Sequence, residues 1–229
     1  MRTYGQYCPV ARAAEVLGDR WTLLVVRDLA EGAHRFIELS QGLPGMSRTL
    51  LTQRLRALER EGIVERRSNG GGHREYWLTE IGEDLKPALL ALGDWAARNY
   101  SRDPVRRELD ARLMLFWVAR HVRREALPQG RFLARFDFRA PRTSTIWLLC
   151  QDGEPTVCTE DPGFERDLVV ATDLTTLNRV FAGRLALSAA LRDRTIELAG
   201  ASAAVRGFAR WFGYSPFAGT GRAMAAKTA

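Results

Sequence analysis

The sequence predicts an α+β protein of two domains. Residues 1–100 contain helical patterns followed by two short strand patterns and a last helix, whereas β-rich segments between 132 and 198 alternate with helical ones. The polar segment 101–104, which ends in Pro104, interrupts the helical period between these regions. We therefore expect one domain over 1–100, a second over 104–217 with a mainly antiparallel sheet, and a flexible tail over 218–229.

The positive charge is concentrated in one part of the chain. The net charge is +7, which permits an anionic partner without naming one. Residues 1–100 carry 14 basic and 13 acidic side chains, but the segment 47–74 holds seven arginines against three glutamates. Residues 101–229 carry 20 basic and 14 acidic side chains without an equally clear focus.

Several classes of protein are disfavoured by composition. The N-terminus lacks the apolar run of a signal peptide, and apolar stretches such as 113–119 are too short to span a bilayer, so we expect a cytoplasmic protein without a membrane partner. A two-residue turn at Asp152-Gly153 would place Cys150 opposite Pro155 and turn Cys158 to the other face of the sheet, which disfavours a disulfide. The spacing gives no zinc motif, and we expect no metal or cofactor.

The order of elements in residues 1–100 is that of a winged helix-turn-helix. A helical segment over 9–30, interrupted at Gly18-Asp19, is followed by a short helix over 35–41 and a Gly/Pro turn. Ser47 can cap the next helix, whose Leu51, Leu55 and Leu58 form a packing stripe. Two strands, 63–67 and 74–78, then flank a glycine-rich loop, and a last helix runs from Thr79 to about Tyr100.

The helix after Ser47 has the composition that reading a DNA major groove requires. With its leucines facing inward, its polar side chains project outward, and arginine and glutamine can recognise guanine and adenine. The candidate contacts from this helix are Ser47, Arg48, Thr49, Thr52, Gln53 and Arg56. The candidate contacts from the wing are Arg66, Arg67, His73 and Arg74. An arginine-rich helix taken alone is more often a solvated face, but element order, spacing and charge together favour double-stranded DNA as the partner.

Five motifs in order resemble one family of regulators. They are Tyr7-Cys8-Pro9-Val10, Asp19-Arg20-Trp21-Thr22-Leu23-Leu24, Arg35-Phe36-Ile37-Glu38-Leu39, Leu51-Thr52-Gln53-Arg54-Leu55-Arg56-Ala57-Leu58-Glu59 and Tyr76-Trp77-Leu78-Thr79-Glu80-Ile81-Gly82. The ordered set over residues 6–100 resembles the HxlR family of winged-helix regulators. The resemblance implies a homodimer that presents two recognition helices to a pseudo-palindromic operator, and thus a DNA-binding transcriptional regulator, which we expect to be a repressor.

Cys8 is a candidate redox sensor. Some members of the HxlR family sense oxidants or electrophiles through a cysteine just before this proline, and Cys8 matches that position. A helix N-terminus stabilises a thiolate, which is the reactive form of cysteine. The alternative is a packed, inert cysteine retained for steric fit.

The second domain is similar to sterol-carrier-protein-like domains over residues 130–213. The similarity rests on the run 167–177, on Phe181-Ala182-Gly183-Arg184-Leu185 and on the helix and strand pattern of 187–198. It implies a tunnel for an apolar small-molecule effector. The candidate lining residues are Leu148, Cys150, Leu168, Val170, Leu177, Phe181, Phe208, Trp211 and Phe212. For each of them, an ordinary place in the core is the more common role.

The sequence disfavours an enzyme. His34, His73 and His121 lie in no metal or hydrolase motif, and the chain has no nucleophile elbow, P-loop or dinucleotide fingerprint. The competing class is a lipid or apolar-ligand binding protein whose helix-turn-helix serves dimerisation only.

Overall fold

The computed structural model describes residues 3–69, 73–100 and 102–228 of the chain. The chain divides into two compact units, Met1–Leu92 and Gly93–Ala229. The division falls inside a helix, α6 (Lys86–Asn99), rather than at 101–104. The second half of α6 packs within the C-terminal unit, because the Phe217 ring lies against Gly93 and the Thr220 hydroxyl donates to Asp94 at 2.5 Å.

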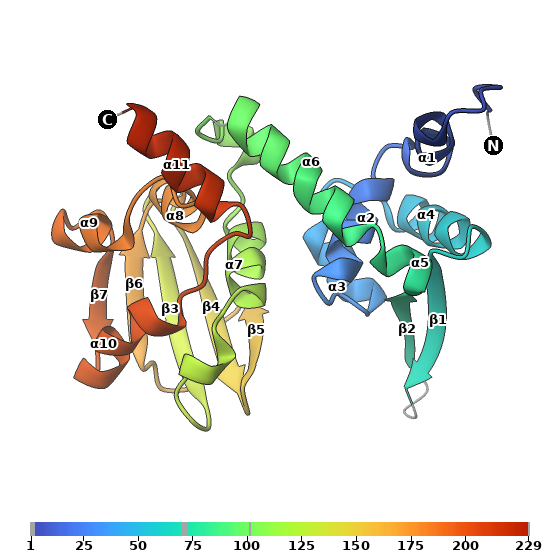
Figure 1. Cartoon of the computed structure of the whole chain (residues 1–229). Coiled ribbons are helices and arrows are strands. Elements are labelled where there is room, and N and C mark those ends of the chain that lie inside the picture. Colours follow the sequence, from blue (N-terminus) through green and yellow to red (C-terminus); the bar gives the residue numbers. More distant parts are fainter. Residues whose placement is uncertain (1–2, 70–72, 101, 229) are drawn as a thin grey trace. The chain divides into compact units, whose positions relative to one another are not determined.

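The N-terminal unit has the element order that the sequence predicts. Its elements are α1 (Pro9–Leu17), α2 (Thr22–Ala30), α3 (Phe36–Gly42), α4 (Arg48–Arg60), β1 (Val64–Asn69), β2 (His73–Leu78), α5 (Glu80–Glu83) and the start of α6. Figure 1 shows α2, α3 and α4 gathered above the β1–β2 hairpin. The helix predicted from Thr79 to Tyr100 is divided into α5 and α6, and Thr79 caps α5.

The core of the N-terminal unit is built from one face of each helix. Val25, Val26 and Leu29 of α2 are buried, as are Leu39 of α3 and the three leucines of α4, and these helices pack on one another and on the hairpin. The buried stripe of α4 has the helical spacing that the sequence predicts.

The C-terminal unit combines a five-stranded sheet with helices. After the 3₁₀ turn Arg106–Glu108, its elements are α7 (Ala111–Arg120), a 3₁₀ turn (Arg124–Ala126), β3 (Phe132–Phe138), β4 (Ser144–Gln151), β5 (Glu154–Cys158), β6 (Leu168–Thr172), α8 (Leu174–Phe181), α9 (Leu187–Arg192), β7 (Glu197–Gly200), α10 (Ser202–Trp211) and α11 (Ala218–Thr228). Helix α7 packs on β4 and β5, and α10 packs on β7 (Figure 1).

The sheet is mixed, so the prediction of a mainly antiparallel sheet is wrong. The strand order is β5-β4-β3-β6-β7, and β3 and β6 run parallel at the centre. The segment 159–167 carries the chain from β5 to the far side of β3, so β6 enters in the same direction as β3. The Asp167 amide donates to the Leu133 carbonyl at 3.0 Å, and the Leu133 amide donates to the Asp167 carboxylate at 2.8 Å. These two bonds fix β6 beside β3.

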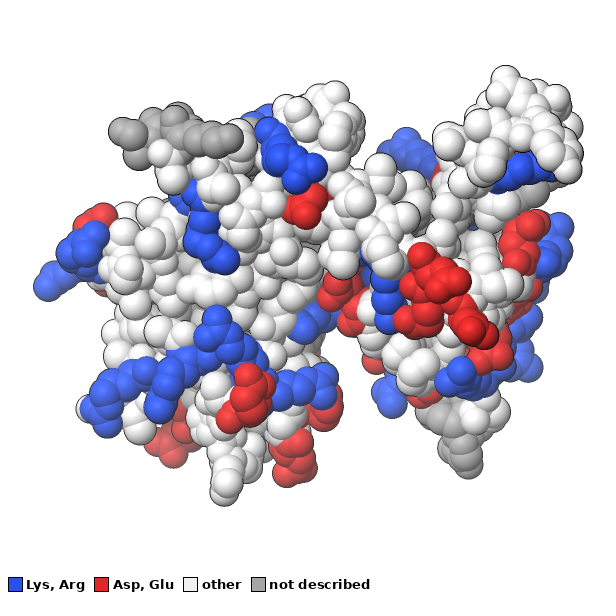
Figure 2. All heavy atoms as spheres, viewed as in Figure 1, with Lys and Arg blue, Asp and Glu red and all other residues white. Residues whose placement is uncertain are grey.

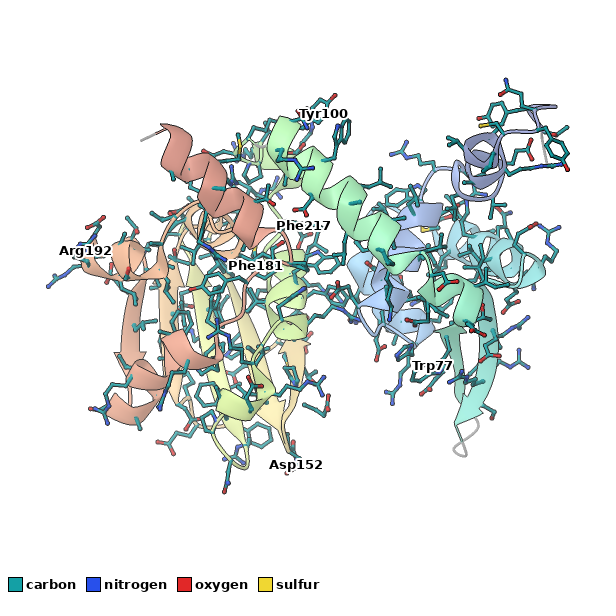
Figure 3. The ribbon with its side chains drawn as sticks, viewed as in Figure 1. Trp77, Tyr100, Asp152, Phe181, Arg192 and Phe217 are labelled. Atoms are coloured by element: carbon teal, nitrogen blue, oxygen red, sulfur yellow. The ribbon has the colours of Figure 1, made fainter. Side chains whose placement is uncertain are left out.

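The predicted turn between β4 and β5 is confirmed. Asp152 and Gly153 have φ angles of 53° and 81°, as a two-residue hairpin turn requires, and Figure 3 shows Asp152 at its tip. Cys150 lies opposite Pro155, and Cys158 lies opposite Trp147. All three cysteines are free thiols.

One face of the sheet forms the core of this unit. Alternate residues are buried along β3, β4 and β6, so Phe136, Ile146 and Val170 lie side by side in register. All nine predicted tunnel residues belong to this packed cluster. Phe208 contacts Trp211 and Phe212, with ring centroids 5.0 and 5.2 Å apart. The rings of Phe208, Trp211 and Phe212 therefore pack on one another within this core.

The segment predicted to be a flexible tail forms a helix over Ala218–Thr228, and its flexibility stays a prediction. Helix α11 spans Ala218–Thr228, and Figure 3 shows Phe217, just before it, between α6 and α11. Its start is fixed by close backbone contact: a Cβ on Gly221 would lie 2.0 Å from the Ala182 carbonyl oxygen. Small residues, read from the sequence as fraying, here allow α11 to pack closely. No helix in the described ranges has the length and apolarity needed to cross a membrane.

Candidate nucleic-acid interface

Helix α4 begins at the residue that the sequence predicts. The Ser47 hydroxyl accepts a hydrogen bond from the Leu50 amide at 3.2 Å, which satisfies one free donor of the first turn. Leu51, Leu55 and Leu58 are each only 1% exposed and fix the rotation of the helix about its axis. The opposite side of α4 therefore has to face solvent.

The exposed side of α4 carries the predicted polar ridge. Arg48, Thr49, Gln53 and Arg56 are exposed, and Thr52 is half-buried. The Thr52 hydroxyl donates to the Arg48 carbonyl at 3.0 Å, which leaves its oxygen lone pairs available as acceptors. Guanidinium and amide groups at helical spacing can make bidentate hydrogen bonds to base edges in a groove about 12 Å wide.

Arg54, in the middle of the same helix, has a different role. Its guanidinium forms an ion pair with Asp19 and donates through Nε to the Arg20 carbonyl at 3.1 Å. It thereby ties α4 to the turn between α1 and α2. Because the Arg54 guanidinium is engaged in this contact, Arg54 stabilises the fold, whereas Arg48, Arg56 and Arg60 of the same helix are exposed.

A hollow of about 610 Å³ lies beside the ridge, between α4 and β1, and it adds a residue to the predicted set. It is lined by Gln53, Arg56, Glu59, Arg60 and Arg66. Arg60 was not among the predicted contacts, although it stands four positions after Arg56 and thus on the same helical face. Among the described residues, no carboxylate lies within ion-pair distance of Arg56 or Arg60. Both guanidinium groups are therefore available to an anion.

The wing holds four of the predicted contacts, and two of these are already paired. Strands β1 and β2 are antiparallel, with Arg66 opposite Tyr76 and Ser68 opposite Arg74. Arg66 donates to Glu59 at 2.8 Å, and Arg67 donates to Glu65 at 2.7 Å. Arg74 is exposed. A count of charges along the sequence treats these arginines and glutamates as independent, whereas in the structure they form ion pairs.

The remaining predicted wing contact is His73. His73 begins β2, but its side chain lies outside the described residues, as do Gly70, Gly71 and Gly72 entirely.

An aromatic stack joins the wing to the body of the unit, and sequence reasoning missed it. The His34 ring stacks on Trp77 with centroids 3.5 Å apart, and the Arg67 guanidinium lies 4.9 Å from the Trp77 ring centroid. The Tyr76 amide also donates to the His34 carbonyl at 2.8 Å. The wing therefore has a fixed base. In the sequence, the adjacent aromatic residues Tyr76 and Trp77 near the end of β2 are the pattern that could have indicated this contact. Figure 3 labels Trp77.

The charges on the surface of this unit are separated. In the view of Figure 2, acidic side chains gather over α5, and basic side chains lie along the hairpin below it. Glu80 and Glu83 belong to α5.

The cysteines of the chain differ sharply in access. Cys8 is exposed at the N-cap of α1, just before Pro9 at the first helical position, and its side chain makes no capping hydrogen bond. Burial raises the pKa of the Cys150 thiol to about 12 and also raises the pKa of Cys158. Oxidation chemistry is therefore favoured at Cys8. Among the described residues, no group of three His, Cys, Asp or Glu side chains is placed to hold a metal ion.

Comparison with known proteins places the N-terminal unit in a family. A family model described as an HxlR-like helix-turn-helix matches residues 16–104. The uncharacterized HTH-type transcriptional regulator YtfH of Escherichia coli is 35% identical over 98 residues, which cover 42% of this chain and 78% of YtfH. This chain belongs to the HxlR-like helix-turn-helix family.

Other transcriptional regulators match a similar share of the chain. The uncharacterized HTH-type regulator sll1512 of Synechocystis is 37% identical over 97 residues, covering 40% of this chain and 72% of its own length. YvaP of Bacillus subtilis is 37% identical over 94 residues, covering 40% and 87%. The solved reduced form of the regulator YodB from B. subtilis is 33% identical, covering 41% of this chain and 95% of YodB, with a TM-score of 0.37.

The HxlR-like match includes the end of α6 and stops before α7 of the C-terminal unit. The family model stops at residue 104, so β3 to β7 and the helices around them lie beyond it. The predicted resemblance of residues 130–213 to sterol-carrier-protein-like domains stays a prediction.

Proposed function

We propose that this HxlR-like protein is a DNA-binding transcriptional regulator that acts as a homodimer on a pseudo-palindromic operator and represses transcription. The relatives YtfH, sll1512 and YvaP are named HTH-type transcriptional regulators. The second helix of a helix-turn-helix reads the major groove, and two such helices in a dimer read two half-sites one helical turn apart.

One observation carries the proposal: α4 combines a fully buried leucine stripe with an exposed polar ridge. Leu51, Leu55 and Leu58 hold the helix, while Arg48, Gln53 and Arg56 face solvent. A helix that served dimerisation alone has no need of unpaired arginines on its exposed side. The alternative of a ligand-binding protein with a vestigial helix-turn-helix is therefore disfavoured.

Exposed apolar side chains support the dimer. Tyr7 and Val10, at α1, are 103% and 76% exposed, and Trp95 and Tyr100, at the end of α6, are 50% and 68% exposed. Large apolar groups this exposed mark interaction surfaces when they lie together on an element. We propose that α1 and α6 pack against their counterparts in a second copy of the chain.

Titration of DNA by fluorescence anisotropy tests the reading helix. The probe is duplex DNA from the region upstream of the protein's own gene, with a scrambled duplex for comparison. Arg56→Ala should weaken specific binding by about 1–3 kcal/mol if Arg56 reads a base. If Arg56 contacts a phosphate instead, binding to both duplexes should weaken equally and the salt dependence should become shallower by about one unit.

Arg206→Ala is the matched control, because Arg206 is an exposed arginine on α10 of the C-terminal unit and does not belong to α4. It should leave both affinities unchanged. A wild-type chain that bound neither duplex above background, or an Arg56→Ala variant that bound both like wild type, would contradict the proposed reading helix.

The dimer has its own test. Trp95→Glu should convert the dimer to a monomer in sedimentation equilibrium, since a buried charge in an apolar interface is costly. Phe164→Glu is the control, because Phe164 is also exposed, at 40%, but lies in the segment between β5 and β6. If the wild type sediments as a monomer, the dimer is wrong.

We also propose Cys8 as a redox input to this regulator. The support is its exposure at the N-cap of α1, where a thiolate is stabilised. Oxidation by hydrogen peroxide, which converts an exposed thiol to a sulfenic acid with loss of water, should release the DNA from the wild type and not from Cys8→Ser. Equal release from both proteins would exclude Cys8.

An apolar effector in the C-terminal unit is a second proposed input. The nine residues predicted to line its tunnel fill a packed core, so such a ligand would have to displace them or bind beside them. Solvent extraction of the purified protein followed by mass spectrometry would find a retained lipid. If nothing is retained and no lipid-like compound binds, the unit serves spacing or dimerisation.

A further inference from the structure

A hollow of about 740 Å³ opens on the C-terminal unit, where the 3₁₀ turn Arg106–Glu108, the start of α7 and the loop between β3 and β4 meet. Pockets that hold small molecules have volumes of roughly 300–1,000 Å³. None of the residues predicted as the apolar tunnel lines it. It is a separate feature of the unit.

Four arginines line this hollow, and only one lining residue, Asp110, carries a negative charge. They come from three separate elements and are Arg106, Arg107, Arg112 and Arg142. Among the described residues, no carboxylate lies within 4 Å of any of these guanidinium groups. The single acidic residue of the lining, Asp110, accepts the Leu113 amide at 2.9 Å as the N-cap of α7. The nearby Glu108 carboxylate accepts hydrogen bonds from Nη1 and Nη2 of Arg102, at 2.8 and 2.7 Å.

The floor of the hollow is apolar. Ile146 and Leu174 also line it, and both are buried members of the sheet core, with exposures of 7% and 3%. Leu109 and Ala111 add half-buried apolar surface. The rim carries the hydroxyls of Thr143 and Ser144. The Leu174 amide donates to the Ala140 carbonyl at 3.1 Å, which holds the start of α8 against the loop that carries Arg142.

We propose that this hollow binds an organic phosphate, in which a dianionic phosphate is joined to a compact apolar group. Four guanidinium groups line the hollow, and the one lining carboxylate, Asp110, already caps α7, so the excess positive charge suits a dianion. Arginine also binds phosphate oxygens through pairs of parallel hydrogen bonds. The apolar floor takes the organic part, since buried apolar surface stabilises binding in proportion to its area. The site is independent of whether α4 reads DNA.

A small molecule fits this site better than the backbone of a nucleic acid does. Phosphate contacts to DNA come from exposed side chains on a surface that follows the duplex, and they leave an apolar floor unused. Here the arginines stand around a concave floor that reaches the core of the unit.

Isothermal titration with phenyl phosphate on the full chain tests the proposal. Phenyl phosphate should bind at least about tenfold more tightly than inorganic phosphate, and phenol should show no heat of binding, because both the charge and the apolar group contribute. Raising the salt concentration should weaken the affinity for phenyl phosphate, because charge attraction contributes.

Two double variants locate the site. Arg112→Gln/Arg142→Gln should lower the affinity for phenyl phosphate by about tenfold or more, since two charge-assisted contacts are lost. Arg206→Gln/Arg210→Gln removes two exposed arginines of α10 and should leave the affinity unchanged. Thermal melting of each variant checks folding, and crystals soaked with phenyl phosphate provide a direct second readout.

Three results would overturn the proposal. They are the absence of any phenyl phosphate binding, an equal loss in both double variants, or phosphate density elsewhere in the soaked crystal. If Arg112→Gln/Arg142→Gln lost affinity for duplex DNA while phenyl phosphate did not bind, the arginines would be a DNA contact and the small-molecule site would be wrong. Failure of the Arg56→Ala test alone would leave this site untouched.

Discussion

The His34 imidazole stacks face to face on the Trp77 indole, with ring planes inclined by only 11° and centroids 3.5 Å apart. His34 precedes α3, whereas Trp77 is the penultimate residue of β2, the second strand of the wing. The stack therefore joins two parts of the helix-turn-helix that lie far apart in sequence, and Arg67 lies over the same indole.

A double-mutant cycle should measure this stack. We expect His34→Ala and Trp77→Leu each to destabilise the N-terminal unit in urea, with a coupling free energy of about 0.5–1.5 kcal/mol, which is typical of aromatic pairs. Because Trp77 also contacts Arg67, Trp77→Leu should be the more damaging of the two. Strictly additive effects would mean that the stack contributes nothing.

The exposed Cys8 thiol should react faster than the buried Cys150 thiol. At pH 8, Ellman's reagent should modify Cys8 rapidly, because Cys8 is exposed. Cys150 should resist, since burial raises its pKa to about 12 and closes access. The rapid phase should be absent in Cys8→Ser, and guanidinium chloride should make all remaining thiols reactive. A rapid phase that survived in Cys8→Ser would contradict this assignment.

Two glycines of α11 should respond oppositely to the same substitution. Gly219 faces open space, so Gly219→Ala should stabilise the helix by about 0.5–1 kcal/mol through lower backbone entropy of the unfolded chain. Gly221→Ala places a Cβ 2.0 Å from the Ala182 carbonyl oxygen and should detach the helix. Limited proteolysis should cut only the second variant faster than wild type. Equal cleavage of both variants would show that α11 does not pack as described.

Glu108 should titrate far below an ordinary glutamate. The two hydrogen bonds from Arg102 are the main cause that lowers its pKa from 4.5 to about 2. A carboxyl with a depressed pKa in the folded chain stabilises the fold above its ordinary pKa, and that contribution is lost as the pH falls through about 2. The window for this contact is therefore pH 4.5 down to about 2.

The carboxyl carbon of Glu108, followed by NMR, gives the measurement. Arg102→Gln should move the inflection upward toward 4.5, whereas Arg107→Gln should move it little, because Arg107 is the smallest of the causes. An inflection near 4.5 in the wild type would refute the ion pair in solution.

The sequence by itself determined the elements whose patterns are local. The N-cap of Ser47 and the leucine spacing of α4 predict both the helix and the face that it buries, because both depend on residues within a few turns. The turn at Asp152-Gly153 likewise predicts that Cys150 lies opposite Pro155. The ordered motifs of residues 6–100 predicted the HxlR-like family, which the comparisons confirm.

Only the tertiary structure decided the features that depend on distant residues. The parallel pairing of β3 with β6 depends on Asp167 meeting Leu133, and the helix over Ala218–Thr228 depends on its approach to Ala182. The ion pairs of Arg66 and Arg67, and the hollow ringed by unpaired arginines from three elements, also require the fold. Periodicity and capping act over a few residues, whereas strand direction, close packing and charge pairing are set by which segments meet in space.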